Sequence, residues 1–146
     1  MSGKEHRETP MGSEAIETSL ARFWMGEDGI IRIFVQPADS TRHHGAEESL
    51  SALAKLCRGR KHPVLADIRN ARAPSREERL AYASAEEIKL VGALALVVES
   101  QLSRIIASFF LGINKLPCPT QVFTCEEKAT QWLHGYVEED RGSKEP

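Results

Sequence analysis

After about residue 50, short apolar runs of strand-like length alternate with amphipathic runs of helical length, and this alternation constrains the fold most. The strand-like runs are Pro63–Ile68, Gly92–Glu99 and Thr120–Thr124. In the runs around them, apolar residues recur at spacings of three and four, which is typical of amphipathic helices. Strands that alternate with helices are joined by right-handed crossovers, so the pattern predicts a mostly parallel sheet covered by helices.

Two further strand-like runs, Leu20–Gly26 and Ile30–Gln36, precede this part and are separated by Glu27-Asp28-Gly29. An Asp-Gly pair between two such runs predicts a β-hairpin, because glycine tolerates the positive φ of a tight turn. The expected order is therefore β-β-α-β-α-β-α-β-α. We expect an α/β domain with a five-stranded, mostly parallel sheet, in which the first strand of the hairpin is an antiparallel edge strand.

The two ends of the chain are polar, so we expect a flexible arm at 1–18, a flexible tail at 139–146 and one domain at 19–138. Lys plus Arg number 19 and Asp plus Glu number 21, and this net charge of −2 argues against a nucleic-acid-binding domain. The longest apolar run, Ala93–Val98, is far shorter than the roughly 20 residues that cross a bilayer. Three cysteines are too few for a disulfide framework and suggest a cytoplasmic protein.

The most apolar helical face follows Ser100 and consists of Leu102, Ile105, Ile106, Phe109, Phe110 and Ile113. A stripe of this width predicts a buried core helix, or a helix that also lines a lipid-sized cavity or a dimer interface. We expect Leu96, Ile106, Phe109 and Trp132 to be largely buried.

Two segments carry a resemblance to a known family. The strand VLADIR (Val64–Arg69) is followed by a capped helix at Ser75, and VFTCEEKATQWL (Val122–Leu133) reads as a strand, a helix start and a final helix. Together with the element order, they resemble the STAS and SpoIIAA-like domains of bacterial anti-sigma-factor antagonists. The run at 102–123 is similar to an uncharacterised bacterial subgroup of that superfamily.

This resemblance implies a non-enzymatic regulatory module that binds a protein partner and needs no cofactor. The CRAL-TRIO lipid-binding domains share topology with the superfamily, so the alternative is a small domain that binds a lipid or another apolar ligand. An enzyme is the third and least supported interpretation. Fold-level analogy establishes none of these functions.

Ser75 is the position where a regulatory phosphorylation would fall. Phosphoregulated antagonists carry Asp-Ser-Ser-Gly or a close variant at this helix start, whereas the chain has Pro74-Ser75-Arg76-Glu77 and lacks the Asp and the Gly. Ser75 and Glu78 also fit a capping box, in which each side chain accepts a hydrogen bond from the other residue's backbone N–H. Ser75 is thus predicted to be an N-cap and is a candidate phosphosite.

Polar residues follow the strands of the expected parallel sheet at their carboxyl ends, where ligands of such sheets bind. These residues are Asp67, Arg69, Ser100, Ser103 and Arg104. One interpretation is a pocket for an anion at the helix that starts near Ser100, since free backbone N–H groups and the helix dipole favour negative charge. The other is an ordinary serine N-cap beside an ion pair between Asp67 and Arg69.

One face of the hairpin combines arginines with aromatic residues, namely Arg22, Trp24, Arg32 and Phe34. These residue types are enriched at the centres of protein interfaces, so we expect a homodimer that uses this face.

No pattern of residues indicates a metal centre or a catalytic group. His43 and His44 are adjacent and cannot chelate one ion from a helix, and the cysteines show no metal-ligand spacing. No nucleophile motif surrounds Cys57, Cys118 or Cys125. We therefore predict neither a metal site nor a catalytic residue.

Overall fold

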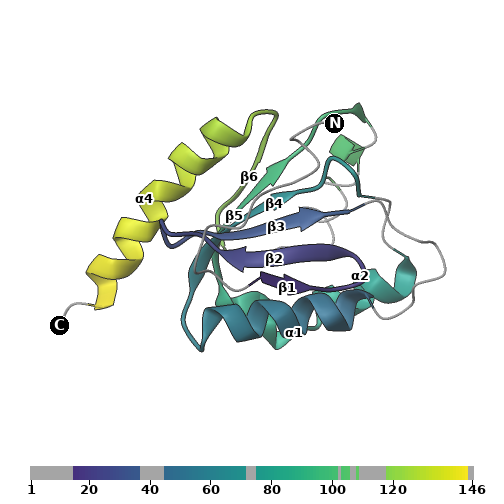
Figure 1. Cartoon of the computed structure of the whole chain (residues 1–146), viewed down its shortest axis with the longest axis horizontal. Helices are drawn as coiled ribbons and strands as arrows, with labels where there is room; N and C mark the ends of the chain where they lie inside the picture. Colours follow the sequence, from purple (N-terminus) through teal and green to yellow (C-terminus); the bar gives the residue numbers. More distant parts are fainter. Residues whose placement is uncertain are drawn as a thin grey trace.

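Six strands form one sheet and lie side by side in the order in which they follow in the sequence (Figure 1). The computed structural model describes residues 15–36, 45–71, 75–101, 103–105, 108 and 118–144. The strands are β1 (Ala15–Glu17), β2 (Ala21–Met25), β3 (Ile31–Val35), β4 (His62–Asp67), β5 (Val91–Val97) and β6 (Thr120–Phe123). β1, β2 and β3 pair antiparallel, and β3, β4, β5 and β6 pair parallel. The expected α/β fold with a mixed sheet is confirmed.

The sheet has one strand more than the five expected. β1 lies within the stretch predicted to be a flexible arm, and it pairs with β2 so that Ile16 is opposite Phe23. β2 is therefore not the edge of the sheet. A three-residue strand with a single large apolar residue is too short for an alternating pattern to reveal it. Ile16 packs against the cluster around Phe23, which holds the strand in place.

The predicted hairpin between β2 and β3 is confirmed, and its turn has the expected chemistry. The backbone N–H of Gly26 donates to the carbonyl of Ile30 at 2.9 Å, and that of Gly29 donates to the carbonyl of Gly26 at 3.1 Å. Gly29 has a φ of +85°, the left-handed conformation that closes a three-residue hairpin loop and that glycine adopts without strain.

Helices cover both faces of the sheet. α1 (Gly45–Cys57), α2 (Arg76–Ala83) and the 3-10 helix η2 (Glu86–Leu90) connect the strands from β3 to β5, and α4 (Glu126–Lys144) follows β6. Between β5 and β6, the described residues 101, 103–105 and 108 are helical. α4 lies on one face of the sheet, and α1 and α2 lie on the other (Figure 1).

Two helix boundaries differ from those expected. The helix predicted from Ser75 to about Leu90 stops at Ala83, because Ser84 donates its hydroxyl to the carbonyl of Leu80 at 3.0 Å and the chain becomes extended at Ala85. At the other end of the chain, α4 continues to Lys144, through most of the predicted tail at 139–146.

The core has two sides, one under each helical layer. On the α4 side, Leu133 packs with Leu65, Ala95 and Val97 of the sheet. On the α1 side, Leu53 and Cys57 pack against Ile31, Val64 and Val91, and Ala52 packs with Phe23. Both arrangements follow from strands whose alternate residues point to opposite faces.

The expected core residues have different outcomes. Leu96 is buried as predicted. Trp132 is only half-buried, because it lies at the margin of the α4-side core. Its ring is tilted against that of Phe123 and makes an edge contact with that of Tyr136, at centroid distances of 5.7 and 5.0 Å. Ile106 and Phe109 lie outside the described residues.

Candidate functional site

The carboxyl edge of the parallel strands holds a buried ion pair. Asp67, the last residue of β4, is 2% exposed. Arg69 donates to both carboxylate oxygens, from Nε to Oδ1 at 2.9 Å and from Nη2 to Oδ2 at 2.5 Å, and its backbone N–H also donates to Oδ1. The hydrogen bonds that Arg69 donates to Asp67 are the main cause of its raised pKa. The ion pair expected at the end of this strand is present.

Two further carboxylates, not anticipated from the sequence, lie near Arg69. The charges of Glu126, the first residue of α4, and of Glu99, which follows β5, also raise the pKa of Arg69. The rule that strand ends gather at one edge could have indicated both, since each lies at the carboxyl end of a parallel strand. With three carboxylates around one guanidinium, the surroundings of Arg69 disfavour an additional anion.

The helix start at Ser100 is capped by the side chains of Ser100 and Ser103. The buried hydroxyl of Ser103 accepts hydrogen bonds from the backbone N–H groups of Glu99 and Ser100, at 2.9 and 3.0 Å, and donates to the carbonyl of Ser100. The side chain of Ser100 accepts from the backbone N–H of Ser103 at 3.3 Å. The hydroxyl oxygens of Ser103 and Ser100 therefore already accept from three backbone N–H groups at this helix start. Arg104 is exposed.

Ser75 is an N-cap with a complete capping box, as predicted. Its hydroxyl oxygen accepts from the backbone N–H of Glu78 at 3.1 Å, and the Glu78 carboxylate accepts from the backbone N–H of Ser75 at 2.8 Å. Glu78 is buried, whereas Ser75 is exposed at the start of α2. The same residue thus fixes the helix end and presents its hydroxyl to solvent.

The aromatic residues of the hairpin face are not exposed, in contrast to the expectation. Trp24 is 3% and Phe34 is 8% exposed within a single chain. The sheet register places Trp24 opposite Arg32 and Phe34 opposite Arg22, and both arginines are partly exposed. Trp24 and Phe34 therefore contribute to the interior of the folded chain, because their large apolar area is removed from water without a second copy. Within a single chain only the two arginines of this face are partly exposed, and the homodimer through it stays a prediction.

A second arginine–aspartate pair, which the sequence did not predict, lies in the hairpin turn. Arg32 donates to both oxygens of Asp28, from Nη1 and Nη2 at 2.9 Å each. His134 of α4 brings its Nε2 to 3.5 Å from Asp28 Oδ2. Burial acts to raise the pKa of Asp28, but the hydrogen bonds and charge of Arg32, with the other donors, lower it overall. Only the spacing of four between Asp28 and Arg32 could have signalled this pair.

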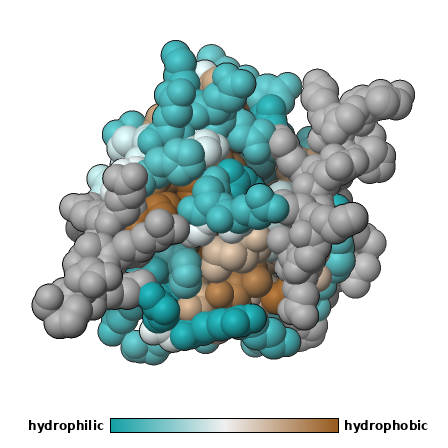
Figure 2. Space-filling view, turned by 60° about the vertical axis from the view of Figure 1, so that its left-hand side comes forward, coloured by the Kyte–Doolittle hydropathy of each residue, from teal (hydrophilic) through white to brown (hydrophobic). Residues whose placement is uncertain are grey.

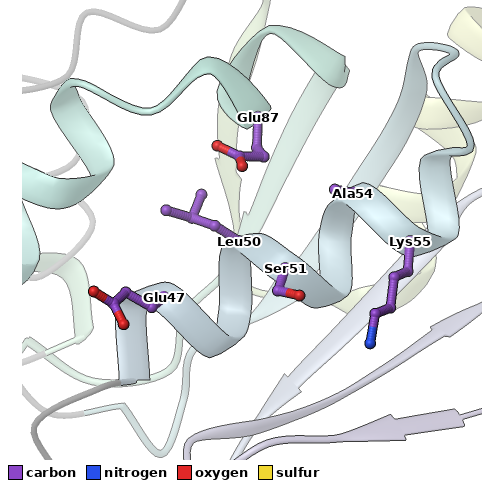
Figure 3. A pocket seen from close by; sticks show the side chains of 6 residues that line it. All are labelled: Glu47, Leu50, Ser51, Ala54, Lys55 and Glu87. Atoms are coloured by element: carbon purple, nitrogen blue, oxygen red, sulfur yellow. The ribbon is translucent and has the colours of Figure 1, made fainter.

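An open groove lies between α1 and η2 (Figure 3). Its volume is about 480 Å³, and it is lined by Glu47, Leu50, Ser51, Ala54, Lys55 and Glu87. The apolar residues Leu50 and Ala54 lie in the middle of the lining and are half-buried. Figure 3 shows Glu87 above Leu50, and Glu47 and Lys55 toward opposite ends of α1.

The three cysteines are free thiols. Burial raises the pKa of Cys57 to about 11, and burial also raises the pKa of Cys118. A thiol with a raised pKa is a weak nucleophile at neutral pH. Among the described residues, no three His, Cys, Asp or Glu side chains are grouped to hold a metal ion. No helix within the described ranges is long and apolar enough to span a membrane.

Seen from the side that is at the left in Figure 1, most of the described surface is hydrophilic, with apolar residues gathered in limited areas (Figure 2).

Comparison with known proteins gives a family but no activity. No curated protein matches the chain. A crystal structure of a protein with unknown function from Arthrobacter sp. FB24 is 32% identical, over 76% of this chain and 96% of that one, with a TM-score of 0.29. Residues 23–137 match the model of a domain of unknown function, DUF7793. The chain belongs to the DUF7793 family.

Proposed function

We propose that this chain is a regulatory protein-interaction module without catalytic chemistry, similar in role to the bacterial anti-sigma-factor antagonists that its sequence resembles. The supporting observation is the apolar surface on the outer side of the α1, α2 and η2 layer. Leu80 of α2 is 59% exposed, and Leu50 and Ala54 of α1 remain half-buried in the groove beside η2. Exposed apolar side chains that lie together on a surface are a sign of a protein-binding site.

The exposed start of α2 fits the same role. A phosphate on Ser75 would lie at the positive end of the helix and next to Arg76, while Glu77 would repel it. It would add close to two negative charges to a surface that a partner contacts. The helix start needs a capping oxygen whether or not Ser75 is phosphorylated. Substitutions of Ser75 that keep or remove this oxygen can therefore separate capping from phosphorylation.

The test of a partner-binding role uses the full chain as bait in its source cells, followed by titration of the captured protein in purified form. We expect saturable binding that weakens at least about tenfold in Leu80→Glu. Gln131→Glu is the control, because Gln131 is exposed on α4 across the sheet from α2. Equal loss in both variants, or no saturable partner, contradicts the proposal.

The test of the phosphosite uses Ser75→Asp, which keeps a capping oxygen, and Ser75→Ala, which removes it. Ser75→Ala should lower the free energy of unfolding by about 1 kcal/mol, and Ser75→Asp should be near neutral. If Ser75→Asp leaves partner binding unchanged and mass spectrometry of protein from its own cells finds no phosphoserine, Ser75 acts only as a cap.

A second candidate function is the binding of an acyl chain. It is favoured by Ile105, which belongs to the most apolar helical face of the sequence and is 55% exposed. Native mass spectrometry of the purified protein decides the matter, since a lipid carrier retains co-purified mass. Protein that is free of any adduct contradicts this second candidate and leaves the first one standing.

A further inference from the structure

The apolar surface of α1 is wider than the sheet needs. Leu53 and Cys57 are buried against the strands. Leu50 and Ala54 belong to the neighbouring stripe, Glu47, Leu50, Ser51, Ala54 and Lys55, whose spacing of three and four places it along one face of the helix. Leu50 and Ala54 line the groove and are not among the residues of the apolar clusters that pack on the sheet. A single amphipathic helix therefore presents one apolar face to the sheet and a second, smaller one to the exterior.

The groove is open along its length, which bears on the kind of molecule it can hold. Small-molecule pockets usually enclose most of the ligand surface. A helix face with a second wall at one side instead suits a segment of polypeptide laid along it. The volume of about 480 Å³ holds a few side chains. The occupant that fits this shape is a short segment that inserts one or two side chains.

The charges of the groove select among such segments. Two carboxylates, Glu47 and Glu87, lie toward the end that contains Leu50, and Lys55 lies toward the other end (Figure 3). The lining therefore holds two carboxylates and one ammonium group. A cation beside the apolar anchor is attracted to the acidic end, and a carboxylate there would be repelled.

We propose that the α1–η2 groove, defined by the six residues above, binds a segment of a partner protein that places an aliphatic side chain on Leu50 and Ala54 and an adjacent lysine or arginine beside Glu87. This inference rests on the proposed function and specifies the chemistry of the partner. The geometry also fixes the order of the two contacts, because the acidic end is the end near the start of α1.

The experiment selects binding peptides from a random 12-residue library displayed on phage, with the full chain as target. Selected peptides are synthesised and titrated against the wild type by fluorescence polarisation. We expect a consensus with an aliphatic residue next to a lysine or arginine. A consensus without a cation, or no enrichment over an unrelated target, overturns the inference.

Variants then locate the site. Glu87→Lys should weaken binding of the selected peptides at least about tenfold, and replacing the peptide's cation by glutamate should restore part of that loss. This reciprocal rescue cannot come from a misfolded variant. Glu86→Lys is the matched control, because Glu86 lies next in the same η2 helix, is exposed and does not line the groove. Glu86→Lys should change binding by less than about twofold.

Failure of this inference differs from failure of the proposed function. If a cellular partner binds the wild type and Glu87→Lys equally, the module binds proteins through another surface. If the selected peptides show the expected consensus, and the charge-reversed peptide regains binding to Glu87→Lys, but no cellular partner is found, the groove binds peptides and the proposed regulatory role is wrong. Peptides that bind equally to Leu50→Ser and to the wild type place the site elsewhere and overturn the inference.

Discussion

The two arginine–aspartate pairs at opposite ends of the sheet differ in burial and in surroundings. Asp67 ends β4 and its side chain is 3% exposed, whereas Asp28 lies in the turn before β3 and its side chain is 28% exposed. In both pairs the arginine donates two hydrogen bonds to one carboxylate. The same chemistry thus serves two purposes: Arg69 compensates a charge that is removed from water, and Arg32 fixes a turn that remains partly hydrated.

Both pairs lie near α4, and the helix contacts them at different points. Glu126 begins α4 close to Arg69, and His134 is two turns further along, beside Asp28. Between these points Ala129 and Leu133 pack on the sheet. Charged side chains of α4 thus lie where the helix passes the two ends of the sheet. Between these places, apolar side chains pack the helix against the sheet.

The largest effect is expected from Arg69→Ala. It leaves the buried Asp67 carboxylate without its ion-pair partner, and we expect the free energy of unfolding to fall by about 3 kcal/mol, as for broken buried pairs. Urea denaturation measures this loss. Arg104→Ala removes an exposed arginine near the same edge and should change stability by less than about 0.5 kcal/mol. Equal effects of the two variants would show that burial of Asp67 does not set the difference.

Gly26→Ala should disturb the Asp28–Arg32 pair by steric overlap, without changing any charge. A Cβ at Gly26 would contact Nη1 of Arg32 and lie 2.7 Å from Asp28 Oδ1 and 3.0 Å from the carbonyl of Ile30. We expect a loss of about 2 kcal/mol, typical of overpacking. Gly135→Ala in α4 is the control, since a Cβ there has no neighbour within 4 Å. The control should stabilise the helix by about 0.5–1 kcal/mol, and thermal denaturation distinguishes the two signs.

Asp28→Asn keeps the shape of the side chain and removes its charge. The variant should lose about 1 kcal/mol, because the pair is partly exposed and its net contribution is modest. A double-mutant cycle with Arg32→Met isolates the interaction between the two side chains. A coupling energy as large as the loss in Arg69→Ala would show that the partly exposed pair stabilises the fold as much as the buried pair does.

The turn pair should also make stability depend on pH in a defined direction. The pKa of Asp28 is lower in the folded chain than its ordinary value near 3.8. The unfolded state therefore binds the proton more readily, so the stability from this carboxylate is present above its unfolded pKa and is lost as pH falls through the folded pKa. The stability difference between wild type and Asp28→Asn should be constant from pH 7 to about 5 and shrink below about 4. A difference that grows in acid contradicts the assignment.

The smallest effect is expected from His134→Gln. His134 is about half exposed and lies 3.5 Å from Asp28, so its contribution should be about 0.5 kcal/mol or less. Urea denaturation measures this contribution, and a loss above about 1 kcal/mol would make the contact to α4 more important than its exposure suggests.

Local hydrogen bonding explains which features could be predicted from the sequence. The Asp28-Gly29 turn, the capping box of Ser75 and Glu78, and the ion pair of Asp67 and Arg69 each join residues within three positions. Their geometry depends on a few backbone dihedrals that side-chain type already favours. The strand and helix order followed from periodicity for the same reason. The short strand β1 was missed because three residues carry too little of a pattern.

The features that only the tertiary structure decided are those that join distant segments. Leu50, Leu53, Ala54 and Cys57 recur at the helical spacing of three and four, yet Leu53 and Cys57 are buried in the core whereas Leu50 and Ala54 line the groove. Alternation placed Trp24 on the mixed face of the hairpin but could not say whether the chain would bury it. The approach of Glu126 to Arg69 and of His134 to Asp28 depends on where α4 crosses the sheet. That position is set by the sum of many weak packing contacts across the whole domain, and no local run of residues contains it.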